Sequence, residues 1–236
     1  VIINAAAYTN VDGAESQEGR IAAWAVNATA VKHLSEAASK HDMALVHIST
    51  DYVFDGTTDN HTEKEEFSPL SVYGQSKAAG DIATSLTPKH YIIRTSWVIG
   101  EGKNFVRTMM SLAQKHINPS VVSDQVGRLT FTSELVRGID HLLQNNCAYG
   151  TYNLSNAGKS ASWADITRSI FKIMQSDCTV TDVTTADYYK DKPGIAPRPL
   201  NSMLSLHKLE ATGFNTKNWQ TELTEYVQKE QKTDNS

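Results

Sequence analysis

Hydrophobic residues in the first hundred positions form two kinds of pattern. Continuous apolar runs occupy residues 1–3, 43–48 and 90–94, which is typical of buried parallel strands. Residues 18–41 instead carry apolar side chains at helical spacing, and a second helix is expected over 69–86, after a Ser-Pro start signal. This order of strand, helix, strand, helix, strand predicts right-handed crossovers and a doubly wound parallel sheet.

The remainder of the chain is richer in helices and loops. Helices are expected over residues 104–116, 133–146, 162–174 and 219–229, and short strands over 120–124, 150–154 and 179–185. Ser162, with Asp165 three residues later, is typical of a helix N-terminus. Ser205 is expected to cap a short helix that Gly213 stops. The region after residue 156 therefore predicts a smaller second domain.

Three of the expected strands end in small or hydroxyl-bearing residues. These residues are Asn4 with the three alanines after it, then Ser49 and Thr50, and finally Thr95, Ser96 and Trp97. The carboxyl ends of parallel strands meet at one edge of a sheet, and ligands bind outside that edge. We therefore expect a binding site there.

Tyr73 and Lys77 are spaced to lie on one face of the second helix. A free tyrosine titrates near pH ~10, and a neighbouring ammonium favours the phenolate. We therefore expect Lys77 to lower the pKa of Tyr73, which makes the phenol a candidate proton donor or acceptor. Thr50 could hydrogen-bond the oxygen that Tyr73 protonates. The alternative without function is a core tyrosine beside a solvated lysine.

Composition argues against several classes of partner. The 236 residues carry a net charge of −4, which favours neither nucleic acid nor an anionic membrane, and no apolar run is long enough to span a bilayer. Cys147 and Cys178 form no framework pattern, which suits a reducing cytoplasm. The eight histidines show no metal-ligand spacing, so no metal ligands are predicted. A monomer and a homodimer fit equally well.

Seven motifs, in order along the chain, resemble those of a known family. They are Asn4-Ala5-Ala6-Ala7-Tyr8-Thr9-Asn10-Val11-Asp12, Ser49-Thr50-Asp51-Tyr52-Val53-Phe54-Asp55-Gly56, Tyr73-Gly74-Gln75-Ser76-Lys77, Arg94-Thr95-Ser96-Trp97, Gly102-Lys103-Asn104-Phe105, Ser123-Asp124-Gln125-Val126-Gly127 and Arg198-Pro199-Leu200-Asn201-Ser202. The chain resembles the extended short-chain dehydrogenase/reductases and, within them, the dTDP-4-dehydrorhamnose reductases. The resemblance implies a Rossmann-like α/β fold and reduction of the C4 keto group of dTDP-4-dehydro-6-deoxy-L-mannose to dTDP-L-rhamnose.

The resemblance also implies roles for individual residues. Thr50, Tyr73, Lys77 and Asn27 would form the catalytic set, with Tyr73 as proton donor, although Asn27 by its position alone reads as a helix-surface residue. The cofactor, NADPH or NADH, would lie against Asn4, Ala5, Ala6, Ala7, Ser49, Tyr73, Lys77, Thr95 and Ser96. The dTDP-sugar would contact Tyr8, Thr9, Thr50, Tyr52, Trp97, Asn104 and Arg198, and a guanidinium suits its diphosphate.

By the same resemblance, residues 1–100 and 131–156 would form the NAD(P)-binding Rossmann domain, and 101–130 and 157–236 the sugar-nucleotide domain. Because the sequence begins as though inside a strand, we interpret it as truncated at the N-terminus, without the first βαβ part and its glycine-rich turn. We therefore expect weak cofactor binding, and the residue that selects NADH or NADPH would lie in the missing part. Mg²⁺ is compatible with the family, but no ligands for it can be assigned. A cytoplasmic location is expected.

Two other functions remain open. A sugar-nucleotide dehydratase or epimerase would share the fold, but dehydratases carry Thr-Asp-Glu after the second strand, whereas Tyr52 follows Asp51 here. A non-catalytic subunit, similar to the regulatory β subunit of methionine adenosyltransferase, would keep the fold and serve a partner protein. Trp97 and Asn104 favour the reductases, because their motifs match that family.

Overall fold

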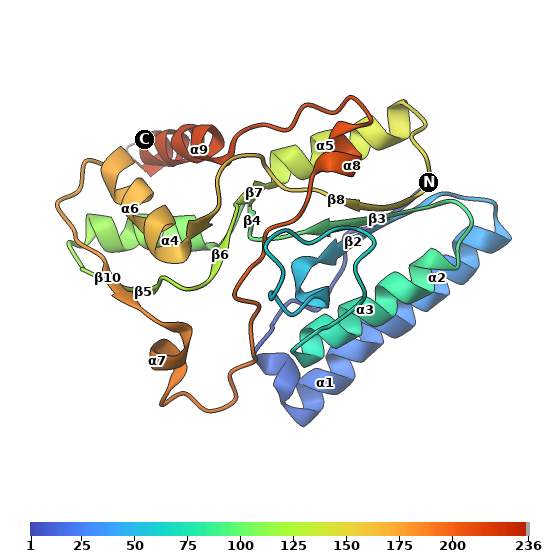
Figure 1. The fold of residues 1–236 in the computed structure, drawn as a ribbon, viewed down its shortest axis with the longest axis horizontal. Coiled ribbons are helices and arrows are strands. Elements are labelled where there is room, and N and C mark those ends of the chain that lie inside the picture. The colour runs from blue at the N-terminus through green and yellow to red at the C-terminus, as the bar shows by residue number, and fades with distance from the viewer. Residues whose placement is uncertain (235–236) are drawn as a thin grey trace.

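A four-stranded parallel sheet lies at the centre of the molecule. The computed structural model describes residues 1–234. The strands are β1 (Ile2–Asn4), β2 (Leu45–Thr50), β3 (His90–Thr95) and β8 (Gly150–Asn153), in the order β1-β2-β3-β8 (Figure 1). Every neighbouring pair in this sheet runs parallel. The predicted α/β fold with a parallel sheet is therefore confirmed.

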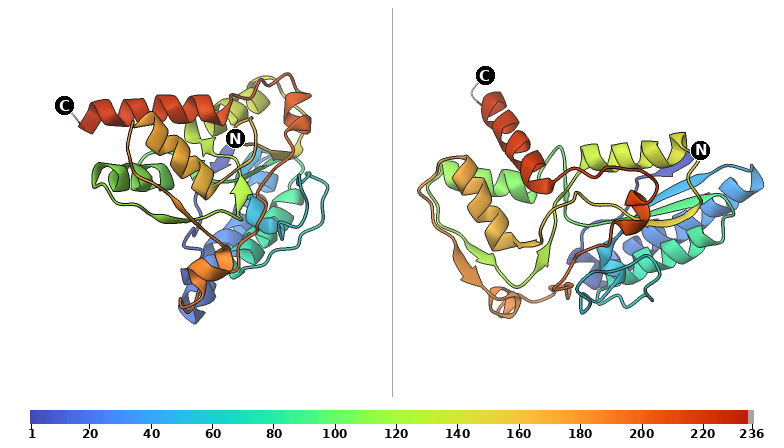
Figure 2. Two further views of the ribbon diagram at one scale, coloured as in Figure 1. Left: turned by 60° about the vertical axis from the view of Figure 1, so that its left-hand side comes forward. Right: turned by 45° about the horizontal axis from the view of Figure 1, so that its top comes forward.

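Helices cover both faces of this sheet. On one face, α1 (Gln17–Trp24), a π-helical segment (Ala25–Thr29) and α2 (Ala30–Lys40) form one continuous rod, with α3 (Val72–Ser85) beside it (Figures 1 and 2). On the opposite face lie α5 (Thr132–Gln144) and the short α8 (His207–Glu210). Leu135 and Leu142 of α5 pack against Val46 and Ile93 of the sheet. The sheet is thus doubly wound.

A second group of elements packs around its own hydrophobic core, on the left in Figure 1. It contains α4 (Phe105–Gln114), α6 (Trp163–Ile173), α7 (Thr185–Tyr189), α9 (Trp219–Asp234) and the parallel pair β5 (Ser120–Val122) and β10 (Thr181–Val183). Val106, Met110, Ile166, Ile170 and Leu223 belong to this core. Two short pairs lie between the cores, β4 (Val98–Ile99) with β7 (Thr130–Phe131) and β6 (Val126–Gly127) with β9 (Ala161–Ser162).

Some local features differ from the predicted pattern. The helix α7 was not predicted, and α8 begins at His207 with Leu206 as its N-cap residue, so the predicted cap at Ser205 is wrong. Gly213 does adopt a left-handed conformation after that helix, with φ of +89°. Among the described residues, no helix is both long and apolar enough to cross a membrane.

The register of the sheet brings the strand ends to one edge. Thr50 of β2 pairs with Thr95 of β3, and Asn4 of β1 pairs with His47 of β2. The segments that follow these strands therefore leave the sheet at the same edge. The residues predicted to bind a ligand there are brought together by this geometry.

Candidate active site

A cleft of about 680 Å³ runs along the carboxyl edge of the sheet. Of the residues singled out from the sequence, those that line it are Ala5, Ala7, Thr9, Ser49, Thr50, Tyr52, Tyr73, Lys77, Thr95, Ser96 and Trp97. Leu135, Val136 and Ile139 of α5 contribute apolar side chains to the lining. Asn4, Ala6, Tyr8, Asn27 and Asn104 lie outside this lining.

Tyr73 lies in the first turn of α3. The side chain of Ser71 caps this helix by accepting a hydrogen bond from the Gly74 N–H. Burial raises the pKa of the Tyr73 phenol to about 12, although Thr50 counteracts this effect. The predicted lowering of this pKa is therefore wrong, because burial raises it and the negative charges of Asp51 and Asp81 act in the same direction. The raised pKa keeps the phenol protonated at neutral pH, as a proton donor requires.

Lys77 lies one turn further along α3 and is 2% exposed. Its ammonium donates a hydrogen bond to the Ile48 carbonyl at 2.6 Å. Burial lowers the pKa of Lys77 to about 8, and the buried carboxyl of Asp81 opposes this shift. The charge of this side chain can therefore be lost just above neutral pH.

His47 packs against Lys77 in the interior and is neutral. Burial, together with the charge of Lys77, lowers the pKa of His47 to about 3. The Asn4 side-chain nitrogen lies 3.1 Å from His47 Nδ1 and donates to it, which places the ring hydrogen on Nε2. That nitrogen faces Lys77 Nζ at 3.5 Å and Asp81 Oδ1 at 3.8 Å. Asn4 thus orients a buried ring beneath the cleft.

Thr50 ends β2 beside the phenol. Its hydroxyl donates to Asp51 Oδ1 at 3.1 Å and accepts a hydrogen bond from the Tyr52 N–H at 3.2 Å. Burial raises the pKa of Asp51 to about 6, against the effect of its hydrogen bonds. A hydroxyl has a single hydrogen to donate. Thr50 must therefore rotate away from Asp51 before it can donate to the oxygen of a ligand.

Asn27 is fully buried inside the π-helical segment, so it is not a helix-surface residue. Its amide oxygen accepts from the Tyr8 N–H at 2.8 Å, and its nitrogen donates to the Tyr8 carbonyl and to Ser76 Oγ, both at 3.0 Å. These bonds join the segment after β1 to α3, the helix of Tyr73 and Lys77. Asn27 therefore contacts α3 through Ser76 rather than lining the cleft, and π-helical turns often mark functional sites.

Two hydroxyl groups in the cleft have no hydrogen-bond partner within residues 1–234: Thr95 Oγ1 and Ser96 Oγ. A buried polar group without a partner costs free energy, so this arrangement favours a polar ligand. The small side chains of Ala5 and Ala7 allow close approach to the end of β1. A nicotinamide cofactor fits these residues, because its ribose and carboxamide offer matching donors and acceptors.

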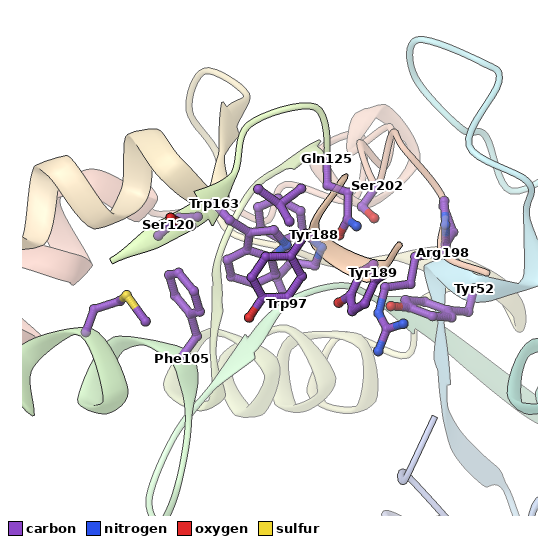
Figure 3. Close-up of a pocket in the computed structure, with 14 residues that line it drawn as sticks. Tyr52, Trp97, Phe105, Ser120, Gln125, Trp163, Tyr188, Tyr189, Arg198 and Ser202 are labelled. Carbon is purple, nitrogen blue, oxygen red and sulfur yellow. The ribbon is translucent and has the colours of Figure 1, made fainter. Parts of the chain in front are cut away.

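A second pocket adjoins the cleft and shares Tyr52, Trp97 and Trp163 with it (Figure 3). Trp97 stacks on Trp163 with ring centroids 3.7 Å apart, and Phe105 packs on Trp163 at 4.4 Å. Other residues of its lining include Gln125, Tyr188, Tyr189, Arg198 and Ser202. Aromatic faces with a few convergent polar groups suit a ligand that contains rings.

Trp97 has an uncommon backbone conformation, with φ of +48°. Bulky residues rarely adopt this left-handed region, and such strain concentrates at ligand-binding positions. Gly127 provides the space that the indole needs, because a Cβ there would lie 3.0 Å from the Trp97 ring. The conformation of Trp97 therefore places its ring between the two cavities.

Arg198 reaches the second pocket from a turn-rich segment late in the chain. Its Nη2 donates to both carboxylate oxygens of Asp12, at 2.8 and 2.9 Å, and its guanidinium lies over the Tyr189 ring. Burial raises the pKa of Asp12, but Arg198 and the Ala196 N–H outweigh it and hold that pKa below its usual value. Arg198 is thus fixed in position at the pocket wall.

Asn104 serves α4 rather than either cavity. Its oxygen accepts from the Arg107 N–H at 3.0 Å, which caps the helix, and its nitrogen donates to the Gly100 carbonyl and to Tyr226. A contact with substrate would require these bonds to break.

Several residues around the two cavities escaped the sequence analysis. They are Asp12, His47, Asp81, Trp163, Tyr188 and Tyr189. Two of them had a readable signal: His47 is polar within an apolar strand, and Trp163 directly follows the predicted cap at Ser162. The pairing of Asp12 with Arg198 had none, because only the fold brings these two residues together.

Side chains at this edge can deliver the proton of a carbonyl reduction, whereas the hydride must come from a cofactor. Combined with the doubly wound sheet, this chemistry defines an oxidoreductase of the short-chain dehydrogenase/reductase class. A narrower assignment comes from sequence comparison. The chain belongs to the family described as RmlD substrate binding domain, whose model matches residues 1–232.

Curated and solved relatives agree with this family. The chain is 40% identical to a dTDP-4-dehydrorhamnose reductase of Aggregatibacter actinomycetemcomitans, over 94% of this chain and 79% of the relative. A dTDP-4-dehydrorhamnose reductase from Bacillus anthracis, solved in complex with NADP, superposes with a TM-score of 0.87 at 36% identity and covers 97% of this chain and 80% of its own. The Clostridium acetobutylicum enzyme of the same name gives a TM-score of 0.89 at 39% identity, with the same coverage.

Proposed function

We propose that this chain reduces the C4 keto group of dTDP-4-dehydrorhamnose to give dTDP-L-rhamnose, with NADPH as the reductant. The observation that carries the proposal is the shared wall of the two cavities, because Tyr52, Trp97 and Trp163 border both. A sugar nucleotide held in the aromatic pocket can therefore present its carbonyl to Tyr73. The names of the relatives, and the NADP in one related structure, support the choice of substrate and cofactor.

The chain's own residues manage the charge that develops on the carbonyl oxygen. Bound NADPH would supply the hydride. Tyr73 donates its phenolic proton to the oxygen, since burial raises its pKa to about 12 and keeps it protonated. Lys77, cationic below a pH of about 8, stabilises the phenolate that remains. Thr50 turns its hydroxyl from Asp51 to the same oxygen and acts as a second donor.

The residues predicted for the cofactor divide into two groups by position. Ala5, Ala7, Ser49, Thr95 and Ser96 line the cleft and would contact the nicotinamide half directly, together with Tyr73 and Lys77. Asn4 and Ala6 would act from behind the lining, Asn4 by orienting His47. We propose NADPH rather than NADH, because NADP is the cofactor named for the related structure.

The residues predicted for the sugar nucleotide gather mainly at the second pocket. Tyr52 and Trp97 offer aromatic faces, and Arg198 offers a guanidinium for the diphosphate, with Thr9 and Thr50 on the side of the cleft. Tyr8 packs near Tyr73 without lining either cavity. The separate hydrophobic cores support a cofactor part, residues 1–100 and 131–156, and a substrate part, residues 101–130 and 157–236. The exception is the segment around α8, because Leu209 and Phe214 pack in the core of the sheet.

The experiment that tests this function compares wild type with Tyr73→Phe. Oxidation of NADPH should depend on dTDP-4-dehydrorhamnose and should fall by about 10²- to 10⁴-fold in the variant, because the proton donor is lost while the ring still fills its site. Absorbance of the reduced nicotinamide measures the rate. Tyr149→Phe, a change of the same kind at an exposed tyrosine, should keep the wild-type rate.

Near-normal turnover in Tyr73→Phe would remove the donor role of this residue. Wild-type protein that binds NADPH and the sugar nucleotide but oxidises no cofactor would favour the non-catalytic subunit instead. A dehydratase would release water from dTDP-glucose without net oxidation of cofactor. In the dehydratase motif a glutamate follows the aspartate, whereas here Tyr52 follows Asp51. Asp51 instead accepts a hydrogen bond from Thr50.

A further inference from the structure

Two helices of the second core end side by side at the surface. α4 and α6 pack on each other, and residues from both ends line one hollow. Each helix closes with a left-handed residue, His116 after α4 (φ +54°) and Gln175 after α6 (φ +56°). The N–H groups of these residues bond back to the carbonyls of Ala113 and Lys172. The two helix ends are therefore closed in the same way and held close together.

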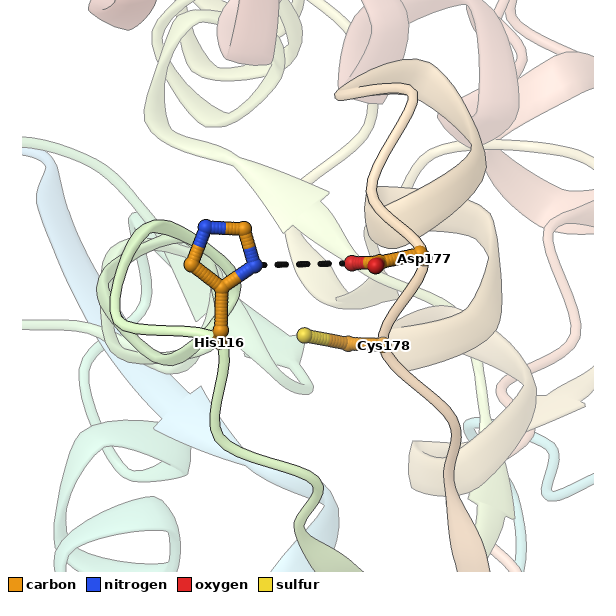
Figure 4. A group of neighbouring side chains, drawn as sticks. All are labelled: His116, Asp177 and Cys178. Atoms are coloured by element: carbon orange, nitrogen blue, oxygen red, sulfur yellow. Dashed lines mark ion pairs between the residues drawn. The ribbon is translucent and has the colours of Figure 1, made fainter.

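Three side chains with metal-binding atoms meet at this place: His116, Asp177 and Cys178 (Figure 4). His116 Nδ1 is 3.4 Å from Asp177 Oδ1, and the candidate ligand atoms of all three lie within 4.8 Å of one another. Ligand atoms of a tetrahedral zinc ion are separated by roughly 3–4 Å, given bonds of about 2.0–2.3 Å. His116 and Asp177 have exposed side chains, so small rotations would complete this geometry.

The backbone at this place favours a cation. The C-terminus of a helix carries a partial negative charge, and two such ends meet here. A cation bound here would be attracted by both helix ends.

We propose that His116, Asp177 and Cys178 bind a divalent cation of the zinc class, with water completing a tetrahedral site. His116 supplies the lone pair of its neutral imidazole, and Asp177 supplies one carboxylate oxygen. Cys178 loses its thiol proton, which is released to solvent as the sulfur–metal bond forms. The sulfur ligand excludes Mg²⁺ and Ca²⁺, which prefer oxygen.

The site joins the far ends of the two helices that border the aromatic pocket. Phe105 is the first residue of α4 and Trp163 the first of α6, and both line that pocket. A cation at the opposite ends would tie the helices together. Zn²⁺ should therefore raise the thermal midpoint of the wild-type protein and leave that of Cys178→Ser unchanged.

Titration with Co²⁺, a spectroscopic substitute for Zn²⁺, tests the proposal directly. One ion per chain should give the visible bands of a tetrahedral site and a near-ultraviolet sulfur-to-cobalt band, with release of a proton. Cys178→Ser should lose the sulfur band. Two further variants, His116→Asn and Asp177→Asn, should each weaken Co²⁺ binding at least about tenfold, because losing even a residue that only hydrogen-bonds a metal ligand lowers affinity by that factor. Asparagine is chosen at position 116 because it tolerates the left-handed backbone.

Cys147→Ser is the matched control, because it removes the other cysteine and should leave the spectrum unchanged. A sulfur band that persists in Cys178→Ser would overturn the proposal, as would equal affinity in wild type and His116→Asn. An octahedral spectrum without a sulfur band would also overturn it and would leave His116 and Asp177 as an ion pair only.

Discussion

At the scale of single residues, Lys77 and His47 lie too close together to carry positive charge at the same time. Their nitrogens are 3.5 Å apart in the interior. Burial and the charge of Lys77 lower the pKa of His47 to about 3, and burial lowers that of Lys77 to about 8. Between these values Lys77 is the cation and His47 is neutral. A protonated Tyr73 and a charged Lys77 therefore coexist at neutral pH.

The first prediction concerns the pH dependence of the reaction. The value of kcat/KM for reduction should fall as pH rises through about 8, by up to tenfold per pH unit, because Lys77 then loses the charge that stabilises the phenolate. A pH profile of NADPH oxidation measures this. Lys77→Met should show low activity without that alkaline limb. A rate that stays constant to pH ~10 would contradict the role of the Lys77 charge.

The same pKa shift predicts a change of stability with pH. The folded pKa of Lys77 lies near 8 and the unfolded value near 10.5, so the unfolded chain binds more protons between these values. The free energy of unfolding should therefore rise with pH in this window, by about 2 kcal/mol between pH 7.5 and 9.5. Urea denaturation of wild type, compared with Lys77→Met at both pH values, isolates this contribution. An equal pH response in both proteins would contradict it.

Residue positions were easier to predict than residue properties. The four-residue spacing of Tyr73 and Lys77 and the strand end at Thr50 placed all three in the cleft. The direction of the Tyr73 pKa shift was predicted wrongly, because spacing reveals a neighbouring charge but not the loss of water around it. The rotation required of Thr50 depends on the hydrogen bond with Asp51, which sequence alone does not specify.

At the scale of elements, the position of α3 depends on its contact with the π-helical segment. A Cβ at Gly80 would lie 2.3 Å from the backbone oxygen of Asn27. The missing side chain lets α3 approach the segment closely enough for Asn27 to bond Ser76. The position of α3, which carries Tyr73, therefore depends on Gly80 and on the buried side-chain amide of Asn27.

Gly80→Ala should therefore destabilise the protein, although glycine-to-alanine changes within helices normally stabilise by roughly 0.5–1 kcal/mol. The added methyl would force α3 away from Asn27, at an expected cost of about 1–3 kcal/mol. Turnover should fall as well, because Tyr73 and Lys77 move with the helix. Urea denaturation and the NADPH oxidation rate measure the two effects.

Ser85→Ala provides the control, since Ser85 is exposed at the end of the same helix and its loss should change stability by no more than about 0.5 kcal/mol. If Gly80→Ala proved more stable than wild type, the close contact with Asn27 would not determine the position of α3.

Element prediction succeeded where burial imposes a period and failed where single contacts decide. The apolar runs gave β2 and β3, and helical spacing gave the rod that contains α1 and α2. The π-helical turn within that rod leaves no mark on the hydrophobic pattern. Ser205 has the right chemistry for a cap, yet its backbone N–H bonds to the His61 carbonyl and the helix starts two residues later.

At the scale of the whole molecule, the candidate site lies where distant parts of the chain meet. The cleft belongs to the sheet, whereas Trp163 and Arg198 come from the later part of the sequence. Asp12, in the segment after β1, holds Arg198 through two hydrogen bonds across 186 residues of sequence. Periodicity cannot reveal such pairs, since it reports only which face of an element is buried. The pocket therefore depends on the assembly of both cores.

This arrangement predicts that Arg198 and Asp12 act as one unit in substrate binding. Arg198→Met should raise the KM for the sugar nucleotide by about ten- to a hundredfold, the value of one charge-assisted hydrogen bond, with a smaller effect on kcat. Arg20→Met, at an exposed arginine of α1, should leave KM unchanged.

Asp12→Asn should raise KM in the wild-type background, because Arg198 loses the carboxylate that positions it, but should have little further effect in the Arg198→Met background. Steady-state kinetics of the four proteins of this double-mutant cycle measure the coupling. Additive effects would mean that Asp12 influences binding independently of Arg198. A KM unchanged in Arg198→Met would remove the guanidinium from the substrate site and leave the Asp12–Arg198 pair as a structural link between the segment after β1 and the second core.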